Sequence, residues 1–205
     1  MNERLSMLRS YTPADLLTLA NASCGTLSIF FCLSYIADDR SPWLWAAFVL
    51  PVFALVFDAL DGYVARLDPR RQSWLGADLD SLADIVSFGV APAVLGYTLG
   101  LRGLWDVVVL TLFVCSGISR LARFNVTSAS LTNEETGKVR YFEGTPIPTS
   151  IVLVIALAVL YQLGLTGQGF WPGEWALFGR TFHPFSVIFL VSGSLMISTI
   201  KVPKP

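Results

Sequence analysis

Six apolar stretches of about 20 residues each dominate this 205-residue chain. A helix rises 1.5 Å per residue, so about 20 apolar residues cross the roughly 30 Å hydrocarbon core of a bilayer. With 54% apolar and 14% charged residues, the chain is more apolar than an average soluble domain. The sequence therefore predicts an all-α integral membrane protein with one domain over residues 1–205. The six expected transmembrane helices cover residues 16–37, 43–66, 77–100, 104–124, 147–165 and 183–200.

Basic residues are distributed unevenly between the two sides of this predicted domain. If the N-terminus is cytoplasmic, eleven of the 14 Lys and Arg residues fall in inner segments. The three on the outer side are Arg40, Arg102 and Arg180. Lys and Arg are enriched in short cytoplasmic loops, so both termini are predicted to be cytoplasmic. The polar stretch of residues 125–146 is predicted to form a cytoplasmic loop.

Four aspartates interrupt the apolar pattern at helical spacing. Residues three or four apart share one helix face, so Asp58 and Asp61 line one stripe, and Asp80 and Asp84 line another. Crowded carboxylates at this depth repel one another and lose solvation unless a positive charge compensates them. Ligand sets made of oxygen favour a hard cation such as Mg²⁺, Mn²⁺ or Ca²⁺. The two stripes therefore predict a divalent-metal site in a helical hairpin.

Two simpler explanations of these acidic residues fit less well. An EF-hand loop that began at Asp58 would need Glu at its twelfth position, where this chain has Pro69. Favourable electrostatics at a helix N-terminus would explain Asp78 and Asp80, but not four carboxylates at helical spacing. A metal site accounts for all four.

The aspartates belong to a pattern of eight fixed residues within 27 positions. The pattern reads Asp58-x-x-Asp61-Gly62-x-x-Ala65-Arg66, then nine residues, then Gly76-x-x-x-Asp80-x-x-x-Asp84. It resembles the signature of the CDP-alcohol phosphotransferase family and departs from it at no fixed position. The resemblance implies a six-helix membrane enzyme, usually a homodimer, with a metal site that faces the cytoplasm. Such enzymes transfer a phosphatidyl or similar group from a CDP-linked donor to an alcohol and release CMP.

The resemblance also implies roles for the motif residues. Asp58, Asp61 and Asp80 would hold the divalent cation, Mg²⁺ or Mn²⁺, with Ca²⁺ as a structural substitute. Asp84 would be the general base and would also touch a second metal. Gly62 and Gly76 lack side chains and would let a bulky ligand approach the helix backbones. The family positions beside the CDP moiety correspond to Gly62, Ala65 and Arg66.

Four segments, one of which overlaps the end of the motif, resemble the branch of the family that uses serine as the acceptor: residues 12–29, 80–93, 119–126 and 141–150. This resemblance implies transfer of a phosphatidyl group from CDP-diacylglycerol to L-serine. Glycerol phosphate, inositol phosphate and choline are the alternative acceptors, and an ion carrier with intramembrane carboxylates is the non-enzymatic alternative. The expected partners are the two substrates, the bilayer and a second copy of the chain, with no nucleic acid. The expected location is a bacterial inner membrane or the endoplasmic reticulum, with the site facing the cytoplasm.

Polar residues within the predicted helices each have two interpretations. Thr18 and Asn21 would either meet the nucleotide of the donor or form hydrogen bonds between helices. Ser81 and Ser87 would either pack between helices or line the acceptor site beside the aspartates. The sequence leaves both pairs open.

The remaining acceptor candidates lie near the predicted inner surface. Arg120 and Arg123, one turn apart, would bind the serine carboxylate or the donor phosphates, or else anchor the helix at the membrane interface. Glu143 would face the substrate ammonium, or else be a solvated loop acid. His183, at the other end, is predicted to be an interfacial residue and not a ligand.

Overall fold

The computed structural model describes residues 11–67, 76–131, 141–167, 170–198 and 201–203. Its α-helices are α2 (Pro13–Asp38), α3 (Ser41–Leu67), α4 (Gly76–Asp84), α5 (Ala91–Leu99), α6 (Leu104–Leu131), α7 (Ile151–Gln162) and α8 (Val187–Met196). A π-helix, η2 (Ile85–Val90), joins α4 to α5, and two 3₁₀ turns, η3 (Ile147–Ser150) and η5 (Pro184–Ser186), precede α7 and α8. Two short antiparallel pairs complete the fold: β1 (Tyr141–Glu143) with β4 (Lys201–Pro203), and β2 (Trp175–Leu177) with β3 (Arg180–Phe182).

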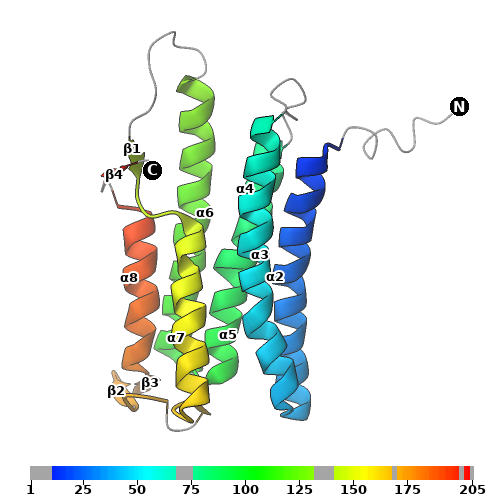
Figure 1. The fold of residues 1–205 in the computed structure, drawn as a ribbon. Coiled ribbons are helices and arrows are strands. Elements are labelled where there is room, and N and C mark those ends of the chain that lie inside the picture. The colour runs from blue at the N-terminus through cyan, green and yellow to red at the C-terminus, as the bar shows by residue number, and fades with distance from the viewer. Residues whose placement is uncertain (1–10, 68–75, 132–140, 168–169, 199–200, 204–205) are drawn as a thin grey trace, which may run out of the picture.

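Four of the helical segments are long and apolar enough to cross a membrane. These segments are Pro13–Asp38, Ser41–Leu67, Gly76–Leu99 and Leu104–Val126. Two shorter apolar segments, Ile147–Gln162 and Pro184–Met196, run beside them along the same direction (Figure 1). The prediction of an all-α membrane protein is confirmed at this level.

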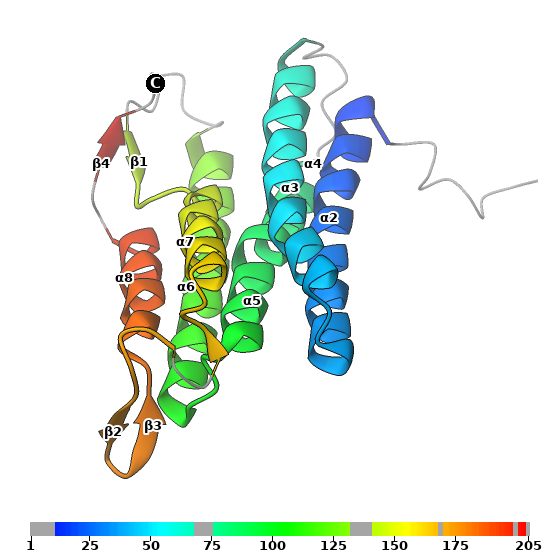
Figure 2. The same cartoon turned by 60° about the horizontal axis from the view of Figure 1, so that its bottom comes forward.

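Helix α2 holds together the part of the bundle that carries the aspartates. It packs along α3 and also contacts α4, η2 and α5. On the other side of the bundle, α6 packs against α8, and α5 packs against α7 (Figure 2). The start of α2, the end of α3 and the start of α4 lie at the top of Figure 1, and the β2–β3 hairpin lies at the bottom. The two ends of the bundle therefore carry different polar features.

Helix α6 extends further than the sequence predicted. Residues 125–146 were expected to form a loop, but α6 continues to Leu131, so the predicted start of the loop was wrong. The polar side chain of Asn125 contacts α4: its amide Nδ2 donates to Asp78 Oδ1 at 3.3 Å, and Ser81 Oγ lies 3.1 Å from its Oδ1. Asn125 thus faces a neighbouring helix. Composition alone does not distinguish a helix with polar interhelical contacts from a polar loop.

The π-helix η2 directly follows the last motif aspartate. Its wider turn is visible in the backbone hydrogen bond from the Ala91 N–H to the Val86 carbonyl, five residues earlier. The Phe88 carbonyl accepts a hydrogen bond from Ser150 Oγ at 2.6 Å. π-Turns are uncommon and often occur at functional sites. The position of η2 beside the aspartates is typical of such a site.

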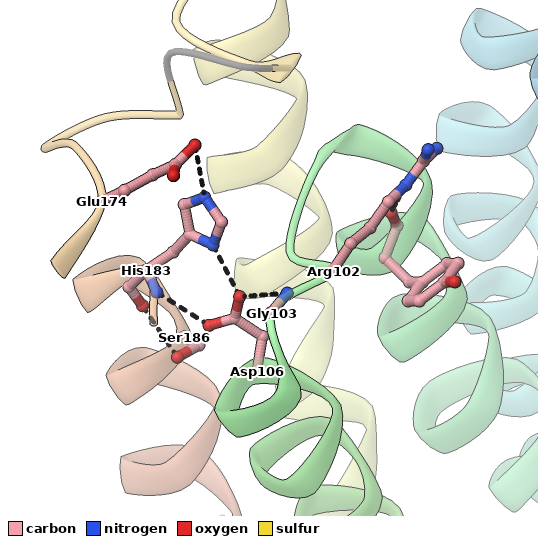
Figure 3. A network of polar contacts seen from close by, with 7 residues as sticks. Arg102, Gly103, Asp106, Glu174, His183 and Ser186 are labelled. Carbon is pink, nitrogen blue, oxygen red and sulfur yellow. Dashed lines mark hydrogen bonds and ion pairs between the residues drawn. The ribbon is translucent and has the colours of Figure 1, made fainter. Parts of the chain in front are cut away.

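A polar network lies at the end of the bundle that carries the β2–β3 hairpin (Figure 3). His183 is 4% exposed, so it lies inside the protein and not on its surface. Asp106, in the first turn of α6, accepts hydrogen bonds from the His183 backbone N–H at 2.9 Å, from its Nδ1 at 2.6 Å and from the Gly103 N–H at 2.9 Å. Glu174 Oε1 lies 3.6 Å from His183 Nε2. These contacts fasten the segment that precedes α8 to the start of α6.

Candidate active site

Three of the motif aspartates converge from two helices. Asp58 of α3 and Asp80 and Asp84 of α4 each offer a carboxylate oxygen, and these oxygens lie within 4.8 Å of one another. Asp84 is buried, whereas Asp58 and Asp80 are partly exposed. The helical spacing predicted that the two aspartate stripes would face each other, and the structure places Asp58 of the first stripe beside both aspartates of the second.

The chemistry of this group fits a divalent cation. All its donors are carboxylate oxygens, which hard cations prefer. Asp80 Oδ1 is buried and has no hydrogen-bond partner within the described part of the chain. A buried carboxylate oxygen without a partner is costly. A bound cation would satisfy this oxygen and offset the mutual repulsion of Asp58, Asp80 and Asp84.

The fourth motif aspartate has a different environment. Asp61 is buried, and its Oδ2 accepts a hydrogen bond from Thr18 Oγ1 of α2 at 2.7 Å. Asp61 does not belong to the three-carboxylate group. Thr18 therefore forms the hydrogen bond between helices that was one of its two predicted interpretations.

A cavity of about 460 Å³ opens beside Asp61 and Asp80. This volume is within the usual range for a small-molecule or cofactor site. The start of α2, the end of α3 and the start of α4 all contribute to its walls. At Gly62 a Cβ atom would meet nothing within 4 Å, so the absent side chain leaves open space here. The predicted residues that line the cavity are Thr18, Asp61, Gly62, Ala65, Gly76 and Asp80.

Sequence reasoning missed the contribution of Asp15. Asp15 lines the cavity and is 3% exposed. It forms a capping box with Thr12: the Thr12 N–H donates to Asp15 Oδ2 at 2.7 Å, and the Asp15 N–H donates to Thr12 Oγ1 at 3.3 Å. The segment Thr12-Pro13-Ala14-Asp15 carries the usual signal for such a helix start, a Thr followed by Pro and then by an acid three residues on. That signal could have placed the start of α2.

The two predicted arginines differ in burial. Arg123 is exposed, whereas Arg120 is partly buried. Arg120 Nε is shielded from solvent and has no hydrogen-bond partner among the described residues, and its guanidinium lies 5.8 Å from the centre of the Phe124 ring. Of the two arginines, Arg120 thus has the side chain that is more shielded from solvent.

Arg66, Ser81 and Ser87 do not line the cavity. Arg66 is exposed at the end of α3 and is not among the residues that line the cavity. Ser87 is buried and donates to the Asn21 carbonyl at 2.9 Å, so it packs between helices. Ser81 likewise contacts Ala77 and Asn125. Glu143 belongs to β1, opposite Lys201 of β4, and its side chain lies outside the described part of the structure.

The chain matches the CDP-alcohol phosphatidyltransferase family over residues 11–192. This match spans most of the sequence and includes every motif residue of the site, and the chain belongs to this family. The resemblance inferred from the eight-residue pattern is confirmed.

Individual relatives share more specific names. The chain is 41% identical over 206 residues to CDP-diacylglycerol–serine O-phosphatidyltransferase of Saccharomyces cerevisiae, covering 98% of this chain and 73% of the relative. It is 34% identical over 201 residues to the enzyme of the same name from Helicobacter pylori, covering 94% and 72%. It is 36% identical over 192 residues to archaetidylserine synthase of Methanothermobacter thermautotrophicus, covering 93% and 69%. All three relatives are named for serine chemistry.

Proposed function

We propose that this chain transfers a phosphatidyl group from CDP-diacylglycerol to the hydroxyl of L-serine, giving phosphatidylserine and CMP. The observation that carries the proposal is the 41% identity, over nearly the whole chain, to a relative named for this reaction. The convergence of Asp58, Asp80 and Asp84 beside a cavity of suitable size supports it independently.

The donor head group would occupy the cavity between α2, α3 and α4. Thr18, Gly62, Ala65 and Gly76 line it, and the open space at Gly62 permits close approach of a ligand to the helix backbone. The exposed Arg66 would reach the nucleotide from the rim. Asn21 was also predicted to bind the donor, but it is not among the residues that line this cavity. The acyl chains of the donor would remain in the bilayer beside the helices.

The motif aspartates would hold Mg²⁺ or Mn²⁺. Asp58, Asp80 and Asp84 supply the converging oxygens, and Asp61 lies at the cavity with one oxygen bonded to Thr18. A divalent cation bound here would neutralise the donor pyrophosphate and stabilise the negative charge that develops on the departing CMP. Without such compensation, the four carboxylates would repel the anionic donor.

Asp84 would act as the general base. Its carboxylate is buried, and it belongs to the group that would adjoin the reacting phosphate. As the serine oxygen bonds to the phosphatidyl phosphorus, the hydroxyl proton passes to Asp84. The bond between that phosphorus and the CMP oxygen breaks, and CMP leaves with the electron pair. Positioning by the protein thus replaces a bimolecular encounter in solution.

The serine carboxylate would pair with Arg120. A guanidinium suits a planar carboxylate, and the buried Arg120 Nε lacks a partner within the described chain. Arg123 is more exposed and is the second candidate, for the carboxylate or the donor phosphates. Three further acceptor candidates rank below the arginines: Ser81, Ser87 and Glu143. The two serines already form hydrogen bonds to neighbouring helices.

The alternative functions lack comparable support. An acceptor such as glycerol phosphate or inositol phosphate would call for more cationic groups than Arg120 and Arg123, and choline would favour an aromatic cage. The three relatives described above are named for serine and not for these alcohols. Membership of a transferase family also argues against an ion carrier.

We further propose six transmembrane helices with both termini in the cytoplasm, in a homodimer. The short segments Ile147–Gln162 and Pro184–Met196 lie alongside the four long ones and would form the last two spans. The asymmetry of Lys and Arg supports the orientation. Cysteine labelling of a Thr136→Cys variant in intact cells tests it, and labelling from outside would overturn it. The membrane would be a bacterial inner membrane or the endoplasmic reticulum.

The decisive experiment identifies the lipid product. Purified protein would receive CDP-diacylglycerol, Mg²⁺ or Mn²⁺, and one labelled alcohol at a time: serine, glycerol phosphate, inositol phosphate or choline. We expect labelled phosphatidylserine and CMP in equal amounts from serine alone. A lipid formed from another alcohol and never from serine would reject the serine assignment while leaving the family chemistry intact.

A further inference from the structure

Asn21 of α2 makes a direct hydrogen bond to the proposed base. Its side-chain Nδ2 donates to Asp84 Oδ1 at 3.2 Å, and both residues are buried. An ionised carboxylate only accepts hydrogen bonds, so the amide must present its N–H group to Asp84. The contact joins residues 63 positions apart in the chain, on two different helices.

The backbone of Asn21 is held by η2, the π-helix that directly follows Asp84. Ser87 Oγ donates to the Asn21 carbonyl at 2.9 Å. One turn along α2, a Cβ on Gly25 would lie 2.7 Å from the Ser87 Cα, a separation that real Cβ atoms do not show. The two backbones therefore touch at Gly25, and the position of Asn21 relative to Asp84 is closely defined.

Packing alone does not account for an amide at this position. Asn21 is 0% exposed, and its Oδ1 has no hydrogen-bond partner among the described residues. A buried polar atom without a partner costs about 1–3 kcal/mol, so an apolar side chain of similar size would suit a purely structural role better. Within the described part of the chain, the side chain has one hydrogen-bond partner, the Asp84 carboxylate.

We propose that Asn21 is a positioning residue for Asp84. Its amide holds Oδ1, and this fixes the rotation of the carboxylate so that Oδ2 is presented to the hydroxyl of the acceptor. Asn21 itself takes no proton and touches no reacting atom. This inference rests on the proposed role of Asp84 as the general base.

The test compares Asn21→Leu with a matched variant of the same helix. Ser28 is also fully buried on α2 and donates to the Ala47 carbonyl at 2.7 Å, so Ser28→Ala removes a buried interhelical hydrogen bond away from the aspartates. We expect kcat of Asn21→Leu to fall roughly 10- to 100-fold, the effect of losing a hydrogen bond to a charged group. The KM values for serine and CDP-diacylglycerol should change by less than about threefold. Ser28→Ala should keep its kcat.

Combination with Asp84→Asn separates positioning from general damage. If Asn21 acts through Asp84, Asn21→Leu should reduce the residual turnover of Asp84→Asn no further. Losses that multiply in the double variant, or an unchanged kcat in Asn21→Leu, would overturn the inference. If Asn21→Leu does not fold, Asn21→Ala removes the same donor without added bulk and carries the same expectations. Near-normal turnover of Asp84→Asn would instead reject the base assignment itself, and this inference with it.

Discussion

Asp106 and His183 lie 77 residues apart in the chain and meet through two hydrogen bonds, at 2.9 Å from the His183 backbone N–H and 2.6 Å from its Nδ1. This pair (Figure 3) joins the start of α6 to the segment before α8, near the β2–β3 hairpin at the bottom of Figure 1, whereas the start of α4 lies at the top. It therefore offers a way to perturb stability without touching the proposed chemistry.

Replacement of Asp106 by Ala should destabilise the fold and spare the site. The change would leave two buried donors of His183 and one partly buried donor of Gly103 without their acceptor, at a cost of roughly 3–5 kcal/mol, as for other broken buried pairs. We expect a lower midpoint of thermal unfolding in detergent, with kcat per folded molecule close to that of the parent protein. A variant as stable as the parent would show that this network contributes little.

Metal dependence should be absolute. Asp80→Asn removes one charge from the converging oxygens, so we expect it to abolish turnover at ordinary Mg²⁺ or Mn²⁺ concentrations while the fold survives. Repulsion among the remaining carboxylates falls in the same variant, so its unfolding midpoint in EDTA should equal or exceed that of the parent. Undiminished activity of the parent in EDTA would contradict the metal assignment.

Asp84→Asn should reduce turnover by roughly 10²–10⁴-fold, the usual contribution of a positioned general base. The amide keeps the size of the carboxylate but not its ability to take a proton. Donor binding, measured separately with Mg²⁺ present, should change less than turnover does. Retention of near-normal phosphatidylserine formation would exclude Asp84 as the base.

Gly62→Leu should block the donor without harming the helix. A side chain at Gly62 would point into open space beside the cavity, and Leu favours a helix over Gly by almost 1 kcal/mol. We expect the KM for CDP-diacylglycerol to rise about tenfold or more, which corresponds to about 1.4 kcal/mol of binding, with no loss of thermal stability. Ala59→Leu, at an exposed position of the same helix, is the control and should bind the donor normally.

The sequence was most informative where helical periodicity decides the geometry. Asp58, Asp80 and Asp84 could be placed together because residues three or four apart share a face and a short connection joins the two helices. The sequence did not predict that Thr18 pairs with Asp61 or that Asn21 pairs with Asp84. Those contacts depend on the rotation and the axial position of α2 relative to its neighbours. Helical periodicity within one segment does not determine either quantity.

Burial of polar side chains was also hard to predict. His183 was expected at the interface because a lone His beside Pro184 at the edge of an apolar stretch is usually solvated. Its partner, Asp106, stands far away in the sequence, and only tertiary structure makes the pair visible. The extension of α6 was not predicted for a related reason: the hydrogen-bond partners of Asn125 lie on α4, which is distant in the sequence.

The π-helix between Asp84 and Ala91 makes the length of this segment as important as its composition. A helical residue advances about 100° around the axis, so the one additional residue in a π-turn offsets everything beyond it by about that angle. Deletion of one residue between Ile85 and Val90 could yield a regular and stable α-helix. The outer half of that helix would nevertheless present the wrong side to α2, or else rotate the aspartates away from Asp58. Such a deletion would hardly change the hydropathy profile and would nevertheless abolish activity. Any chimera or insertion in this region must therefore preserve the rotation of the outer half of the helix relative to the half that carries the aspartates.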